Sequence, residues 1–274
     1  MRLKVAAVNA AEWVRRQFEV KALLNSGIDA IDIRIANLRR GPSADELRLA
    51  NWAHEANIGV HAHSWVGSRG PSGSSNATAH DGAQQGLYAV ASVAAMNAVR
   101  FGVNAERDVW RGEEYAPGKF EAHGGAVDFL DSFADVFHGN ARNAHLDYVG
   151  FAVPSVHYKG DADIPDWLQL RFGRVCVMAY QSSLGAVQAV VQRAADYWLA
   201  HDEAPSLEPW VGCGRIDERG RVVGSAQASV AVARERRALT WYVGFGAENQ
   251  LVQGHKHHPP IIQLVRELKP EVRA

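Results

Sequence analysis

The stretch "AVRFGVNAE" (residues 98–106) has the pattern of a strand that is buried in a sheet and ends in a pocket. Phe101 and Val103 stand on one parity of the run, whereas Asn104 and Glu106 stand on the other. Successive side chains of a strand point to opposite faces, so we expect the apolar set to pack against helices and the polar set to face inward. The run therefore predicts a buried strand whose last inward residue is a carboxylate.

Runs of this kind recur along the chain and alternate with amphipathic stretches typical of helices. Including residues 98–106 there are eight, and the other seven are residues 3–9, 30–37, 59–66, 146–155, 174–181, 209–216 and 239–246. Strands that alternate with helices indicate an α/β fold with a parallel sheet, and eight such units close a (β/α)8 (TIM) barrel. We therefore predict a single barrel domain over residues 1–274. The alternative is an open doubly wound sheet, but no G-x-G-x-x-G turn follows the first run.

Two of the helical stretches carry clear signals. Ser43 stands three residues before Glu46, which predicts a capping box at the start of a helix. Residues 13–27 are expected to form one amphipathic helix that ends near a glycine. The apolar face of this helix is expected to hold Val14, Phe18, Ala22 and Leu23.

The composition is that of a globular protein, with 47% hydrophobic and 22% charged residues. A formal net charge of −1 gives no general attraction to nucleic acid or to an anionic membrane. Cys176 and Cys213 lie in apolar runs and are expected to be buried free thiols. The first residues do not read as a signal peptide, and no apolar run is long enough for a membrane span. We expect a cytoplasmic protein, or one released without a signal peptide.

In such a barrel the carboxyl ends of the strands form the functional face. The inward parity of the runs at residues 30–37, 59–66 and 98–106 is polar, and its members are Asp32, Arg34, His61, His63, Trp65, Arg100, Gly102, Asn104 and Glu106. Burial would raise the pKa of Glu106 and suit it to donate a proton. The alternative is an ion pair with Arg34 or Arg100, which would lower that pKa and make Glu106 structural.

The segments "VRFGVNAE" and "MAYQ" (residues 178–181) resemble two motifs of glycoside hydrolase family 18, the chitinase-like family. That family carries D-x-x-D-x-D-x-E on its fourth strand and M-x-Y-D on its sixth. The resemblance implies a barrel glycosidase in which Glu106 is the proton donor and Tyr180 is the tyrosine of the sixth strand. Gln181 stands where the family has the final aspartate. The barrel is also similar to that of family 25, the lysozyme-like family.

A glycosidase normally needs a second carboxyl group, for which Asp32 and Glu248 are the candidates. We expect Asn104 and Tyr180 to orient polar groups of the substrate. The remaining residues expected to bind substrate are Arg34, His61, His63, Trp65, Trp110, Gln181 and Trp241, and the tryptophans among them would stack on sugar rings. The expected partner is a polysaccharide such as a cell-wall glycan, in a phage-related assembly. No cofactor or resident metal is expected.

Two other functions remain open. His61 and His63 share a face, and with Glu106 they would supply three ligands for the metal of a hydrolase or isomerase. The chain also has Val99, Gly102 and Asn104 where family 18 has aspartates. This replacement favours an inactive barrel that serves as a binding or structural module in an assembly.

Overall fold

The computed structural model describes most of the first half of the chain and shorter pieces of the second half. The described residues are 2–7, 9–66, 78–104, 125–150, 168, 170–178, 184–198, 206–212, 215–216, 222–223 and 240–244. Several residues singled out above lie outside these ranges, namely Glu106, Trp110, Tyr180, Gln181, Cys213 and Glu248.

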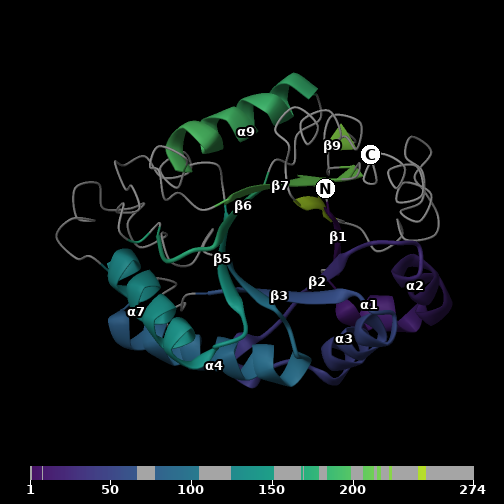
Figure 1. Cartoon of the computed structure of the whole chain (residues 1–274), viewed down its shortest axis with the longest axis horizontal. Coiled ribbons are helices and arrows are strands. Elements are labelled where there is room, and N and C mark those ends of the chain that lie inside the picture. The colour runs from purple at the N-terminus through teal and green to yellow at the C-terminus, as the bar shows by residue number, and fades with distance from the viewer. Residues whose placement is uncertain are drawn as a thin grey trace.

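Eight parallel strands form the centre of the fold (Figure 1). They are β1 (Arg2–Ala7), β2 (Ala30–Arg34), β3 (Gly59–Trp65), β4 (Arg100–Asn104), β5 (His145–Gly150), β6 (Arg174–Met178), β7 (Ser206–Gly212) and β10 (Thr240–Gly244). Each strand pairs with the next in chain order, and β10 pairs with β1, so the sheet closes into a barrel. The predicted α/β class and parallel sheet are confirmed.

The described helices lie on the outside of the sheet (Figure 1). They are α1 (Ala10–Arg15), α2 (Gln17–Leu24), the 3-10 helix η1 (Leu38–Arg40), α3 (Ala44–Glu55), α4 (Ala79–Met96), α7 (Gly125–Asn140) and α9 (Leu184–Trp198). Within the described ranges no helix has the length and apolar character needed to cross a bilayer. The full set of eight helices and the single domain over residues 1–274 stay predictions.

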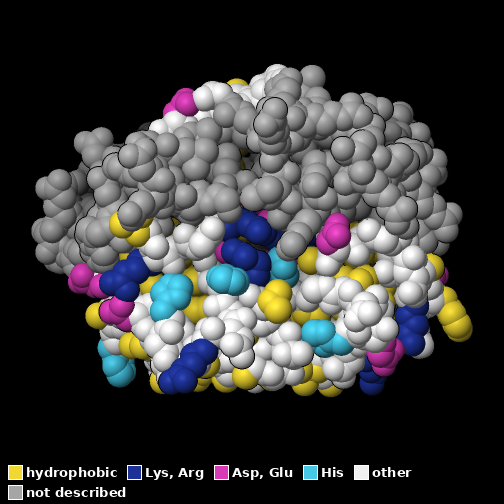
Figure 2. All heavy atoms as spheres, viewed as in Figure 1, with side chains coloured by type: hydrophobic (Ala, Val, Ile, Leu, Met, Phe, Trp, Pro, Cys, Tyr) yellow, Lys and Arg dark blue, Asp and Glu magenta, His cyan; other side chains and the backbone are white. Residues whose placement is uncertain are grey.

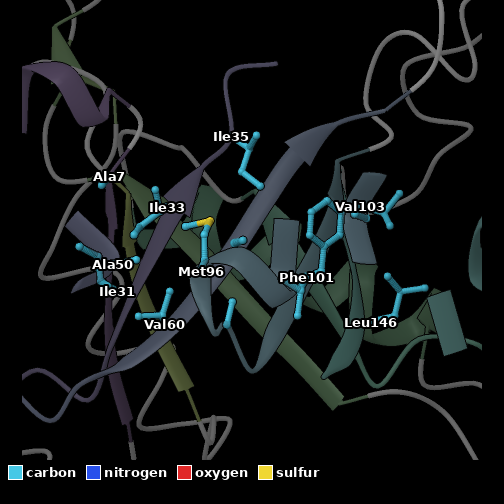
Figure 3. Packing of buried hydrophobic residues seen from close by; sticks show 14 of the residues in the cluster. Ala7, Ile31, Ile33, Ile35, Ala50, Val60, Met96, Phe101, Val103 and Leu146 are labelled. Carbon is cyan, nitrogen blue, oxygen red and sulfur yellow. The ribbon is translucent and has the colours of Figure 1, made fainter. Parts of the chain in front are cut away.

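The main apolar core fills the space between the strands and the helices (Figure 3). Ile31, Ile33 and Val60 are fully buried there. Phe101 of β4 stacks on Phe133 of α7, with ring centroids 6.0 Å apart. These residues belong to the parity that the sequence assigned to the helix-facing side. The other parity of the same strands is therefore left to line the barrel interior.

The predicted capping box is confirmed at the start of α3. The Ser43 hydroxyl accepts from the backbone N–H of Glu46 at 3.3 Å, and the Glu46 carboxylate accepts from the backbone N–H of Ser43 at 2.7 Å. The same carboxylate accepts from the backbone N–H of Ala36 at 2.9 Å. Glu46 thereby ties the segment that follows β2 to the first turn of α3.

The helix predicted over residues 13–27 is wrong as a single helix. It is two short helices that meet at Arg16, whose φ of −104° and ψ of 46° are not helical. The break shifts the phase of the helical pattern, so Phe18 is 86% exposed while Trp13 and Val20 are buried beside Leu23. Periodicity read across a break assigns the wrong face.

The run predicted at residues 209–216 also differs from the structure. β7 begins earlier, at Ser206, and ends at Gly212, so it includes Glu208. Arg215 does not end this strand but lies in β8 (Arg215–Ile216), which pairs antiparallel with β9 (Val222–Val223). Proline is uncommon inside a paired strand, and a run that starts at Pro209 leaves out the acidic residue before it.

Candidate functional site

Lys4 lies at the centre of a charged cluster inside the barrel. Its side chain is 1% exposed, and its ammonium lies 2.5 Å from a carboxylate oxygen of Glu208 and 3.4 Å from one of Asp32. His61 Nδ1 lies 3.5 Å from the same ammonium. Because an ammonium can only donate, the Nδ1 atom accepts, and His61 is a neutral ring with its proton on Nε2. Lys4 of β1 therefore contacts side chains from three other strands, β2, β3 and β7.

His63 extends the cluster toward the carboxyl ends of the strands. Its Nδ1 atom donates to the Asp32 carboxylate, which can only accept, so the tautomer of His63 carries its proton on Nδ1. Both side chains are almost completely buried. Asp32 thus binds Lys4 on one side and His63 on the other.

Two arginines complete the charge balance of the interior. Arg174 donates to Glu208 at 2.5 Å. Arg100 holds Asp147 with two hydrogen bonds, of 2.7 Å and 2.5 Å. In the face shown in Figure 2, a group of Lys and Arg side chains lies midway across the upper edge of the coloured part, beside histidines. The buried carboxylates Asp32, Glu208 and Asp147 each have at least one cationic partner.

The pKa values of the cluster follow from this pairing. Burial alone would raise the pKa of Glu208, but Lys4 and Arg174 outweigh it and lower that pKa to about 2. Burial likewise opposes ionisation of Asp32, yet attraction to His63 and Lys4 holds its pKa below the usual value. Burial and the nearby Lys4 lower the pKa of His61 to about 3. At neutral pH Asp32 and Glu208 are ionised, and His61 is uncharged.

Cys176 of β6 lies against the same cluster. It is a buried free thiol, as the sequence predicts. Its Sγ atom lies 3.7 Å from a carboxylate oxygen of Glu208, and burial raises its pKa well above the usual value. The thiol is therefore protonated and acts as a weak donor to the carboxylate.

The ends of β2, β3 and β4 bring a second group of residues together, which we call the mouth cluster: Arg34, His63, Trp65 and Asn104. Arg34 pairs with His63 in the strand register, and Trp65 pairs with Asn104. The guanidinium of Arg34 lies over the indole of Trp65, 4.9 Å from the ring centroid. Trp65 is 56% exposed, whereas Asn104 is buried. The mouth cluster thus presents one exposed aromatic ring with a cation against it.

Gly102 makes room for His63 in the interior. A Cβ atom at Gly102 would lie 3.0 Å from the Cβ of His63 and 2.7 Å from a methyl group of Val149. Both distances are shorter than real Cβ contacts allow without a shift. The side chains of His63 and Val149 therefore occupy the space that a side chain at position 102 of β4 would need.

The structure brings together six of the residues that the sequence proposed for the site: Asp32, Arg34, His61, His63, Trp65 and Asn104. Trp241 lies in β10, where its backbone pairs with Leu3. The proposed residues Glu106, Trp110, Tyr180, Gln181 and Glu248 lie outside the described part of the chain.

Sequence reasoning missed four members of the buried cluster: Lys4, Asp147, Arg174 and Glu208. Lys4 stands between Leu3 and Val5 in an apolar run, and a lysine in a buried run signals an internal ion pair. Nothing in the sequence names its partners. Arg100, one of the two alternative partners of Glu106, donates two hydrogen bonds to Asp147.

The side chains around His61 and His63 do not favour a bound metal ion. The Lys4 ammonium occupies the Nδ1 side of His61, and Asp32 engages Nδ1 of His63. Among the residues that the structure describes, no group of three His, Cys, Asp or Glu side chains is arranged to hold an ion. Glu106, the third ligand of the metal hypothesis, is not among them.

Comparison with known proteins identifies the fold only. No protein-family model matches the chain, and no curated protein does so. Among solved structures, a chitinase from Bacteroides thetaiotaomicron is 10% identical with a TM-score of 0.64, over 97% of this chain and 95% of that one. A GH18 chitinase from Pseudoalteromonas aurantia is 6% identical with a TM-score of 0.62, over 98% and 99%.

A sugar epimerase has a similar fold. D-psicose 3-epimerase from Clostridium cellulolyticum H10 is 10% identical with a TM-score of 0.53, over 100% of this chain and 98% of that one. The predicted likeness to family 18 barrels is confirmed at the level of fold, whereas the likeness to family 25 stays a prediction.

Proposed function

We propose that this chain is a glycoside hydrolase-like barrel that acts on a polysaccharide, such as a cell-wall glycan, at the carboxyl ends of its strands. The observation that carries the proposal is the exposed ring of Trp65 at the barrel mouth, next to Asn104 in the strand register. An indole face suits the apolar face of a sugar, and buried amides beside it suit sugar hydroxyls. The similar fold of two chitinases supports the same class of substrate.

Glu106 is our choice for the general acid. It follows Asn104 by two residues, so a strand that continued would carry both on one face. Asp32 and Glu208 are ionised at neutral pH, so neither can donate a proton. Burial raises the pKa of Asp147, but two hydrogen bonds from Arg100 occupy both of its oxygens. An acid is therefore expected from outside the buried cluster.

The remaining roles follow the same scheme. Asn104, Tyr180 and Gln181 would orient the substrate, and either Asp32 or Glu248 would be the second carboxylate. An ionised Asp32 suits stabilisation of positive charge in the transition state better than proton transfer. The aromatic residues proposed for further sugar subsites are Trp110 and Trp241. The proposal includes a complete (β/α)8 barrel as one domain.

The test compares wild type with Glu106→Gln for release of reducing sugar from peptidoglycan and from chitin-type polymers, with and without EDTA. Glutamine keeps the shape but removes the proton, so the rate should fall by about 10²–10⁴-fold. Glu55→Gln is the matched control, because Glu55 is largely exposed at the far end of α3. Equal rates for wild type and Glu106→Gln would refute the acid role.

A metal-dependent hydrolase or isomerase at His61, His63 and Glu106 is the second candidate. The fold it shares with D-psicose 3-epimerase favours it, and Lys4 beside His61 opposes it. Activity abolished by EDTA and restored by a divalent ion would select this function.

A binding module without catalysis is the third candidate. Gly102 stands where family 18 has an aspartate, and His63 and Val149 fill the space that such a side chain would need. Retained glycan binding without sugar release by wild type would select the binding module.

A further inference from the structure

The mouth cluster contains a cation, Arg34, to which the described residues offer no anionic partner. Arg34 ends β2 and Trp65 ends β3, where the carboxyl ends of barrel strands form the functional face. The buried carboxylates below them are already paired: Asp32 with Lys4 and His63, Glu208 with Lys4 and Arg174, and Asp147 with Arg100. In the described part of the chain, no carboxylate lies within ion-pair distance of Arg34.

The hydrogen bonds of Arg34 give a second and independent indication. Its Nε atom is buried and has no hydrogen-bond partner in the described part of the chain. Buried polar groups of proteins are almost always hydrogen-bonded, so this unsatisfied N–H indicates that the described residues do not hold the guanidinium through acceptor groups. The guanidinium keeps its position through the ring of Trp65, at 4.9 Å, rather than through an acidic side chain.

The geometry points to a carboxylate-bearing sugar unit, such as a hexuronic acid, as the ligand of Arg34 and Trp65. A guanidinium offers two parallel N–H donors, one on each Nη atom, that match the two oxygens of a carboxylate. Trp65 remains 56% exposed with Arg34 against it, which leaves indole surface for the sugar ring that carries the carboxylate. This inference rests on the proposed function, because it names the class of glycan for the same site.

Recognition would be local rather than general. A formal net charge of −1 does not attract an acidic polymer to the molecule as a whole. The preference for an acidic unit should therefore depend on one guanidinium, and it should disappear when that group is replaced.

The experiment measures binding by calorimetry with three probes: an oligogalacturonate, the same oligomer after reduction of its carboxyl groups, and a sulfated neutral oligomer of equal length. We expect wild type to bind the oligogalacturonate about 10-fold to 100-fold more tightly than the reduced oligomer, as for a charge-assisted hydrogen-bonded pair. Arg34→Gln should abolish the preference, and Arg34→Lys should retain only part of it, because lysine keeps the charge but not the fork. Trp65→Ala should weaken binding of both the oligogalacturonate and its reduced form.

Arg39→Gln is the matched control, because Arg39 is exposed in η1, and it should bind as wild type does. Circular dichroism and thermal unfolding check that each variant is folded. Equal affinity of wild type for the charged and reduced oligomers, or no binding of either, would overturn the inference. Equal affinity for the sulfated oligomer would overturn the choice of carboxylate. A preference lost in Arg34→Gln supports it even if Glu106→Gln leaves sugar release unchanged, so this inference and the proposed catalysis fail separately.

Discussion

Replacement of Lys4 by methionine tests the buried charge cluster most severely. Lys4 is 1% exposed and lies 2.5 Å from Glu208 and 3.4 Å from Asp32. Methionine fills much of the same volume but leaves both buried carboxylates with less positive charge beside them. Removing one member of a buried ion pair lowers the free energy of unfolding by about 3–5 kcal/mol.

The expected loss in the free energy of unfolding is about 3–5 kcal/mol rather than twice that, because each carboxylate keeps one partner. Glu208 retains Arg174, and Asp32 retains His63. A domain has a total stability of only about 5–15 kcal/mol, so Lys4→Met should be marginally folded. Urea unfolding followed by tryptophan fluorescence measures the loss, since the chain has 8 tryptophans.

Two further variants make the result interpretable. Lys21→Met is the matched control: the side chain of Lys21 is 42% exposed and its ammonium lies 3.8 Å from Glu55, so the loss should be about 1 kcal/mol or less. Adding Asp32→Asn to Lys4→Met removes the carboxylate that has lost its cationic partner, while the amide oxygen can still accept from His63, so it should recover part of the loss. The reasoning is refuted if Lys4→Met is no more destabilising than Lys21→Met, or if Asp32→Asn makes the Lys4 variant less stable still.

Two other perturbations probe the same interior. The pKa of His61 is lowered from 6.5 to about 3 and that of Glu208 from 4.5 to about 2, so the unfolded chain binds more protons in these windows. Stability in urea should therefore fall as pH falls from 6.5 toward 2, and His61→Gln should flatten the upper part of this curve; a curve unchanged by His61→Gln would contradict the assignment. Gly102→Ala should lower the free energy of unfolding by about 1–3 kcal/mol, and by less in a Val149→Ala background, as urea unfolding would measure. Gly139→Ala, whose added methyl group meets nothing within 4 Å, is its control, and an equal effect at both glycines would contradict the packing argument.

The parity of the strands could be predicted because it depends on local alternation. The pattern at residues 98–106 predicts Phe101 on the helix-facing side and Asn104 inside. The structure agrees, since Phe101 packs on Phe133 of α7 and Asn104 is buried. The capping box of Ser43 and Glu46 is likewise a short-range feature. Such features follow from neighbouring residues, so a single sequence is enough to find them.

The pairing of charges inside the barrel could not be predicted in the same way. Lys4 and Glu208 lie in the first and seventh strands in chain order and meet only because the sheet closes. Pro209 hid the start of the strand that carries Glu208, and the break at Arg16 changed the buried face of the first helical stretch. Closure of the barrel creates these contacts, and alternation along one strand carries no information about them.

The most direct test of the proposed function is the initial rate of reducing-sugar release from peptidoglycan by wild type, Glu106→Gln and Glu55→Gln at neutral pH. Acid catalysis by Glu106 predicts that its variant is slower by about 10²–10⁴-fold while Glu55→Gln and added EDTA leave the rate unchanged. A Glu106→Gln variant as fast as wild type would contradict it.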